Sequence, residues 1–133
     1  MKNSKMLKTI LILSGAIGAG IGAAILFAPA AFHGSAGIEL GDSASLLSEI
    51  RAPGGMLLAC GLLIMLGAFI ARMTFTATVI SAALYLSYGA SRLFSMAIDG
   101  MPHETLVLAA ALEIIVGLVC VFALVKYQNP QAA

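Results

Sequence analysis

The chain has 133 residues, enough for one domain. Its hydrophobic fraction is 61% and its charged fraction 10%, whereas soluble domains average about 45–50% apolar and about 25% charged residues. The net charge of +1 provides no basic field for nucleic acid, so the composition excludes an ordinary soluble domain and a nucleic-acid-binding protein.

The first apolar run covers residues 7–28 and follows three lysines, Lys2, Lys5 and Lys8. At about 1.5 Å per residue, a helix over this run is about 33 Å long, which matches the hydrocarbon core of a bilayer. A cleaved signal peptide is the alternative, because residues 28–30 resemble a cleavage site. The run exceeds the usual apolar stretch of about 7–15 residues in signal peptides, so we expect a retained transmembrane helix.

Residues 29–49 form the one long polar segment, and residues 29–43 within it are predicted to be an outer loop. Pro29 is expected to end the first helix, and Asp42 or Ser43 is suited to cap the next one. The second helix is predicted over residues 44–71, with a kink near Pro53 because proline lacks the amide that a helix interior needs.

Two more apolar runs predict helices over residues 73–98 and 105–125. Short links between consecutive long helices favour antiparallel neighbours. The predicted fold is therefore all-α, a single domain over residues 1–133 that forms an integral membrane four-helix up-down bundle.

The distribution of basic residues predicts the orientation of this bundle. With the N-terminus inside, the inner side holds five basic residues and the outer side only Arg51. Positive residues favour the cytoplasmic side, so both termini are predicted to be cytoplasmic. The inner residues are Lys2, Lys5, Lys8, Arg72 and Lys126.

Arg92 and Glu113 are charged residues within the third and fourth apolar runs. From the predicted helix ends, they lie roughly 9 Å and roughly 12 Å below the outer surface at helical rise. Charge inside a bilayer is costly unless it is paired, so we predict an ion pair between adjacent helices. This pair either holds the two helices in register or lines a ligand or ion site. The sequence does not decide between the two roles.

Other polar groups are predicted in the same outer layer. Tyr88, Arg92, Ser95 and Asp99 share one helix face by their spacing, and Glu49 and Arg51 precede the second apolar run. A small-residue row beside this face is expected to permit close helix contact. This row contains Ala83, Ser87, Ser91 and Ser95. The candidate binding cluster comprises Glu49, Arg51, Tyr88, Arg92, Ser95, Asp99 and Glu113.

His33 and His103, both predicted at the outer surface, are weak candidates for metal ligands, and their spacing matches no familiar metal motif. Residues 18–23 match a dinucleotide-binding spacing, but they lie inside an apolar run and are better read as a close-packing face. Cys60 and Cys120 are predicted to be buried packing residues. We predict no metal, no cofactor and no catalytic residue.

Several of these motifs together resemble a known family. They are the sequence EIRAPGG over residues 49–55, GASRLFS over residues 89–95, Asp99-Gly100 followed by Pro102, and Glu113. In this order they resemble an uncharacterised bacterial family of small four-helix inner-membrane proteins, known only as a domain of unknown function. The resemblance covers nearly the whole chain and implies a four-helix membrane fold in the bacterial inner membrane, with no activity to transfer.

The expected function is that of a small non-enzymatic membrane protein. Its outward-facing polar cluster would bind a lipid headgroup or a small polar ligand, or the protein would act as an accessory subunit. The alternative is a small oligomeric proton-coupled transporter or channel with Glu113 as the proton carrier. Membrane lipids are the expected partners, together with a homo-oligomer or another membrane protein, and no nucleic acid is expected.

Overall fold

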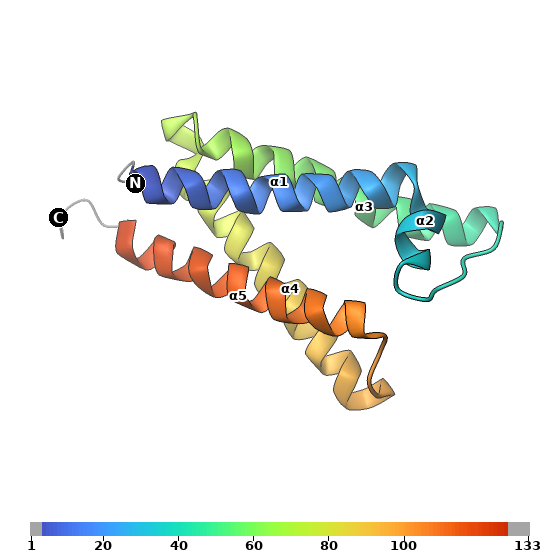
Figure 1. Ribbon diagram of the computed structural model, residues 1–133. Coiled ribbons are helices and arrows are strands. Elements are labelled where there is room, and N and C mark those ends of the chain that lie inside the picture. The colour runs from blue at the N-terminus through green and yellow to red at the C-terminus, as the bar shows by residue number, and fades with distance from the viewer. Residues whose placement is uncertain (1–3, 128–133) are drawn as a thin grey trace.

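The computed structural model describes residues 4–127, and in this range the chain is helical apart from short connections. Figure 1 shows the elements in chain order. They are α1 (Lys5–Phe27), α2 (Pro29–Gly34), α3 (Ala44–Gly67), a short 3-10 helix η1 (Ala71–Met73), α4 (Thr74–Asp99) and α5 (Glu104–Tyr127).

The segment predicted as an outer loop contains the short helix α2. Ala28 has left the helical conformation after α1, and Pro29 starts α2 at its first position. Proline suits this position because its missing amide would have no helical partner there. The prediction treated Pro29 only as a stop signal and therefore missed the helix that it begins.

Helix α3 runs without interruption through Pro53. At its start, the Ser43 side chain accepts a hydrogen bond from the amide of Leu46, as expected for a capping serine. The helix ends at Gly67, short of the predicted end at residue 71. There the hydroxyl of Thr74 donates to the Gly67 carbonyl at 2.8 Å and ties the turn to the start of α4.

The long helices pack as two pairs, α1 with α3 and α4 with α5 (Figure 1). Glycines bring the backbones of α1 and α3 together. A Cβ on Gly22 would lie 2.3 Å from the amide nitrogen of Leu58, and one on Gly61 would lie 2.3 Å from that of Ala19. Such distances are impossible without backbone movement, so this close approach requires glycine at these positions.

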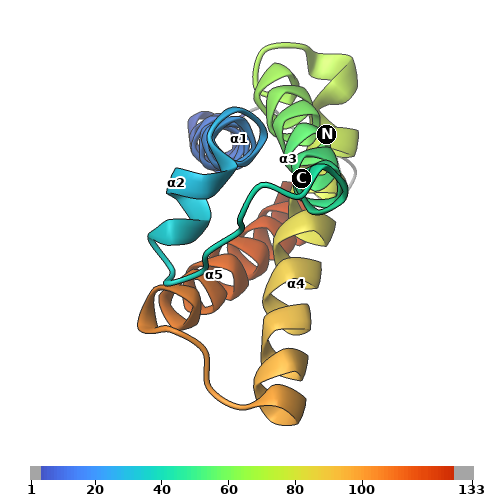
Figure 2. The same cartoon turned by 90° about the vertical axis from the view of Figure 1, so that its right-hand side faces the viewer.

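The two pairs meet at one end and diverge toward the other (Figure 1). A buried apolar cluster joins them near the start of α1 and the end of α5. Its members are Leu7, Leu11, Ile64, Ala68, Ala77, Ala123 and Tyr127. At the divergent end, α2 descends from α1 toward α5 (Figure 2), and the Thr105 hydroxyl donates to the Ser35 carbonyl at 3.4 Å.

Among the described residues, three helices are long and apolar enough to cross a membrane: α1, α3 and α5. The sequence prediction counted four such helices. Helix α4 has the length, with 26 residues, but its threonines, serines and tyrosines and Arg92 lower its hydropathy. The finding therefore supports a chain with several potential membrane-spanning helices, and not the complete predicted bundle.

Candidate functional site

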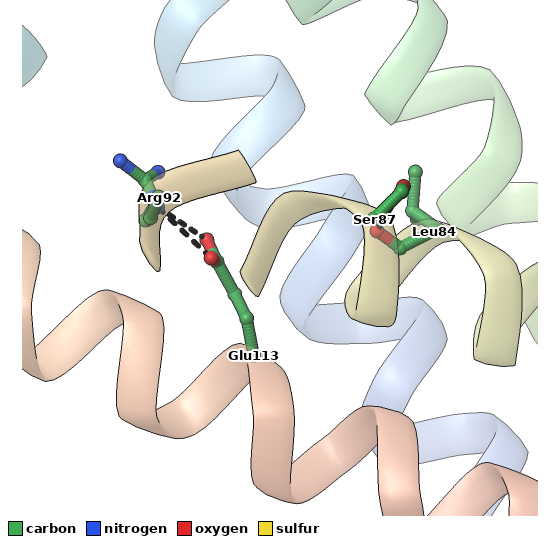
Figure 3. A network of polar contacts seen from close by, with 4 residues as sticks. All are labelled: Leu84, Ser87, Arg92 and Glu113. Carbon is green, nitrogen blue, oxygen red and sulfur yellow. Dashed lines mark hydrogen bonds and ion pairs between the residues drawn. The ribbon is translucent and has the colours of Figure 1, made fainter. Parts of the chain in front are cut away.

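Arg92 of α4 and Glu113 of α5 form an ion pair at the divergent end of the molecule. The Nε–H of Arg92 lies 2.9 Å from one carboxylate oxygen of Glu113 and 3.1 Å from the other (Figure 3). The exposed fractions of the two side chains are 31% and 14%, so the carboxylate is the more enclosed group. The predicted pairing is confirmed.

Close contact between α4 and α5 positions this pair. Gly89, almost one turn before Arg92, packs so tightly that a Cβ there would lie 2.5 Å from Cγ1 of Ile114. A Cβ added to Gly117, one turn after Glu113, would lie 2.5 Å from a methyl carbon of Leu86. Because α4 and α5 are antiparallel, both glycines lie on the joined-end side of the ion pair, where the two backbones approach closely.

The pair uses only one edge of the Arg92 guanidinium. Both hydrogen bonds come from Nε, and the two terminal nitrogens lie on the side away from Glu113 (Figure 3). Within residues 4–127, neither terminal nitrogen has a hydrogen-bond acceptor in the protein. An arginine with this edge free can bind an oxyanion with two parallel hydrogen bonds.

Arg92 borders a cavity of about 270 Å³ between α4 and the start of α5, which we call the α4–α5 groove. Hydroxyl groups and apolar side chains both contribute to its wall. The lining residues are Tyr88, Ser91, Arg92, Ser95, Met96, Pro102 and Leu106. The groove thus combines a cationic edge with hydroxyl donors.

A second cavity, of about 90 Å³, lies where the two helix pairs diverge, and we call it the apolar slot. Most of its wall is aliphatic or aromatic, and the Arg92–Glu113 pair forms part of it. The lining residues are Ile17, Gly18, Ile21, Ile25, Phe32, Leu57, Leu84, Tyr85, Tyr88, Arg92, Leu112 and Glu113. Tyr88 and Arg92 line both cavities, so these two side chains lie between the groove and the slot.

The remaining predicted site residues are not all gathered here. Ser95 lines the groove and donates to Asp99 at 3.1 Å, and Asp99 is exposed at the end of α4. Arg51 instead donates to the backbone carbonyl of Leu26 at the end of α1. Glu49 is exposed and has no polar contact with any of residues 4–127.

A family model for a domain of unknown function, DUF4345, matches residues 6–124. The chain belongs to this family. No curated protein and no solved structure matches the DUF4345 chain. The comparisons therefore supply a family and no activity.

The small-residue row predicted in this DUF4345 chain does not mediate helix contact. Ala83, Ser87, Ser91 and Ser95 are all exposed. The hydroxyl of Ser87 turns back to the Leu84 carbonyl at 3.0 Å (Figure 3). The close contact occurs instead through Gly89 and Gly117, because the absent side chain matters more than small size alone.

The sequence analysis missed several groove and slot residues. Ser91 was visible in the small-residue row, and Tyr85 lies one turn before Tyr88 on α4, so a search for polar side chains near Arg92 would have found both. The aliphatic slot residues carry no such signal, because the same residue types cover every membrane-facing surface.

The weak metal candidates each bond within their own segment. His33 Nδ1 lies 2.9 Å from the Pro29 carbonyl, and His103 Nδ1 lies 2.7 Å from the Thr105 hydroxyl. In the part of the chain that is described, no three His, Cys, Asp or Glu side chains form a group that could hold a metal. Cys60 and Cys120 are free thiols and buried, and Cys120 Sγ lies 3.1 Å from the Ser81 hydroxyl.

Proposed function

We propose that this chain is a four-helix integral membrane protein of the bacterial inner membrane that binds an oxyanion-bearing ligand at Arg92. The observation that carries the proposal is that Arg92 has a free guanidinium edge and lines a cavity of about 270 Å³ with hydroxyl groups in its wall. A lipid headgroup and a small polar anion both supply oxygens that match this edge.

The membrane location is supported by the outer surfaces of the helices. Large apolar side chains are exposed along α3 and α5, among them Leu62, Leu66, Leu108, Ile115, Leu118, Phe122 and Val125. Soluble monomers rarely expose contiguous apolar surface of this extent, whereas hydrocarbon chains cover it at no cost. In this proposal α4 is the fourth span, and its polar side chains Tyr88, Ser91, Arg92 and Ser95 line the groove.

The proposed orientation has both termini in the cytoplasm. It is supported by the basic residues at the joined end of the molecule, where Lys8, Arg72 and Lys126 lie, since positive residues favour the cytoplasmic side. A membrane-impermeant maleimide tests it. We expect the reagent to label an Asp42→Cys variant in intact cells and an Arg72→Cys variant only after permeabilisation, because both native cysteines are buried. The reverse pattern would overturn the orientation.

Ligand binding is tested on protein purified in nanodiscs made from native membrane lipids. We expect native mass spectrometry to detect a bound anionic species on the wild-type protein, and this species to be lost from Arg92→Gln. Arg72→Gln is the matched control, because Arg72 is exposed and borders neither cavity. Retention of the same species by a folded Arg92→Gln protein would overturn the proposal.

Proton-coupled transport with Glu113 as the carrier is the second candidate. Its support is the position of Glu113 in the wall of the apolar slot with 14% of its side chain exposed. Proton flux into liposomes that is lost with Glu113→Gln would favour transport over binding.

A further inference from the structure

We infer that the ligand is a single-chain amphiphile with one oxyanion head, of the kind represented by a long-chain carboxylate, and that its chain enters the apolar slot. This inference rests on the proposed function at Arg92 and adds the ligand class. The observation behind it is that Arg92 and Tyr88 line both the polar groove and the apolar slot. A ligand held by Arg92 can therefore reach both cavities, and only an amphiphile matches both walls.

The charges around Arg92 limit the head group. Glu113 already balances the guanidinium charge through Nε, and Asp99, held by Ser95, is a second acid on the same helix. A head with several negative charges would meet two carboxylates and only one cation. A head with a single negative charge, in contrast, can accept hydrogen bonds from the free N–H groups of Arg92 and from the hydroxyl of Ser91 or Tyr88.

The slot favours hydrocarbon because most of its wall is aliphatic or aromatic, and two of its polar side chains are already hydrogen-bonded: Tyr85 donates to the Ser14 carbonyl, and Glu113 accepts from Arg92. A cavity with mostly aliphatic walls remains dry unless several polar partners are available, and dry cavities bind apolar groups. The slot's volume of about 90 Å³ is a third of the groove's volume of about 270 Å³. The slot thus accepts a segment of one chain, and the rest of that chain lies in the surrounding bilayer.

The geometry also indicates where the chain enters. The slot lies between the two helix pairs, with Ile21 and Leu57 from the first pair and Leu112 from the second. Leu112 has 45% of its surface exposed, so it lies at the mouth of the slot. An amphiphile can therefore reach the slot sideways from the bilayer while its head stays at the level of Arg92.

The test uses the full-length protein in nanodiscs and a photoactivatable long-chain fatty acid with a diazirine on the part of the chain next to its carboxylate. We expect cross-links to map to peptides that contain Ile21, Leu57 or Leu112, and an excess of palmitate to suppress them. Arg92→Gln should weaken binding about tenfold, because it removes a charge-assisted pair of hydrogen bonds. Leu112→Trp should reduce slot cross-linking severalfold by filling the mouth.

Leu118→Trp is the matched control, because Leu118 is exposed on the same helix and does not line the slot. Circular dichroism and thermal unfolding check that each variant is folded, and Ile21→Ala, which enlarges the slot, gives a second variant if Leu112→Trp does not fold. Ile21→Ala should still bind the probe but shift the cross-linked positions.

Three outcomes separate the inference from the proposed function. If acetate displaces the probe as well as palmitate does and Leu112→Trp has no effect, the ligand is a small polar anion, so the inference fails and the proposed function stands. If a diacyl anionic lipid alone competes, the single-chain assignment fails. If folded Arg92→Gln binds the probe as tightly as the wild-type protein does, both the inference and the proposed function fail.

Discussion

Arg92 is a residue whose two edges have different surroundings. Its Nε–H bonds to Glu113 across the α4–α5 contact, whereas its terminal nitrogens have no acceptor within residues 4–127. The residue lines the α4–α5 groove. Placing an unpaired Arg at the centre of a helix within a bilayer costs about 2.5–3.5 kcal/mol on insertion scales. In the proposed four-span arrangement, Glu113 offsets part of this cost, and the terminal nitrogens of Arg92 remain as donors.

Removing one partner of the ion pair is expected to cost more stability than removing the other. Arg92→Gln leaves the short, more enclosed Glu113 carboxylate without a partner, whereas Glu113→Gln leaves a long Arg92 side chain that can extend toward the headgroups. We therefore expect Arg92→Gln to lower the free energy of unfolding by about 1–3 kcal/mol and Glu113→Gln to lower it by less. Both effects are modest, because both side chains are partly exposed and solvent screens their charges.

Unfolding of both single variants and the double variant in detergent measures this difference. The double variant should be less destabilised than the sum of the single variants, with a coupling of about 1 kcal/mol. Arg72→Gln controls for loss of a surface cation. Additive effects would mean that the ion pair contributes nothing to stability.

Arg51 has a structural role at the break between α1 and α2. Its guanidinium donates to the Leu26 carbonyl, which belongs to the last turn of α1 and has no intrahelical partner there. We expect Arg51→Ala to destabilise the protein by about 1–2 kcal/mol, because a hydrogen bond from a charged donor is lost. Faster hydrogen exchange restricted to residues 26–34 would locate the effect, and an equal effect of Arg72→Ala would contradict it.

At the scale of single residues, the sequence showed which charged residues lie in apolar runs, but it did not always show which group each of them contacts. Arg92 and Glu113 were found because each is a charge in an apolar run, and helical rise placed them at similar depths. The partner of Arg51 was not predictable, because a backbone carbonyl at a helix end has no sequence signal. Glu49 was grouped with the site by proximity in sequence, yet its side chain faces solvent.

At the scale of elements, the contact between α1 and α3 depends on glycines that face the opposite backbone. A Cβ on Gly61 would lie 2.3 Å from the Ala19 amide nitrogen and 2.7 Å from the Gly15 carbonyl oxygen. These neighbours are backbone atoms of a helix and cannot rotate away. A methyl group at this position must therefore push the two helices apart.

Gly61→Ala is expected to destabilise the protein by about 1–3 kcal/mol through overpacking. Gly55→Ala on the same helix is the control, because a Cβ there meets no atom within 4 Å. That change should be neutral or stabilise by up to about 1 kcal/mol, since alanine favours helix more than glycine does. Thermal unfolding in one detergent compares the two, and equal effects would contradict the contact.

Apolar runs predicted the long helices to within a few residues because length and hydropathy dominate helix formation in lipid. Helix α2 was missed because six residues are too few to give a periodic pattern. The facing surfaces were predicted only in part. The spacing of small residues identified Gly22 correctly, but the serine row of α4 has the same spacing and is exposed.

At the scale of the whole molecule, two helix pairs are joined at one end by an apolar cluster and diverge at the other. The apolar slot and the Arg92–Glu113 pair both lie in the divergent part. No sequence pattern predicts the divergence of the two helix pairs, because the divergence depends on how tightly the helices pack within each pair. The sequence indicated a bundle and gave no angle between its halves.

Helix α4 is not among the helices apolar enough to span a membrane by composition. A reporter fused after Asp99 gives a protein that lacks α5. We therefore expect this reporter to show that α4 inserts poorly into the membrane. Arg92→Leu should restore insertion in that fusion by removing the costly charge. A fusion after Gly67 is the control, since α1 and α3 meet the criterion. Efficient insertion of α4 without α5, with no effect of Arg92→Leu, would contradict this expectation.

The low hydropathy of α4 also has a consequence for biosynthesis. The partner of Arg92 is Glu113, which the ribosome adds 21 residues later. In the proposed four-span arrangement, the cation of α4 has no counterion when α4 leaves the ribosome, and we expect the insertion machinery to hold the helix until α5 follows. We expect α4 and α5 to enter the bilayer together as a hairpin, after α1 and α3 are already in place. A substitution at Glu113 would then act first on the yield of correctly inserted protein, before any effect on a ligand could be measured.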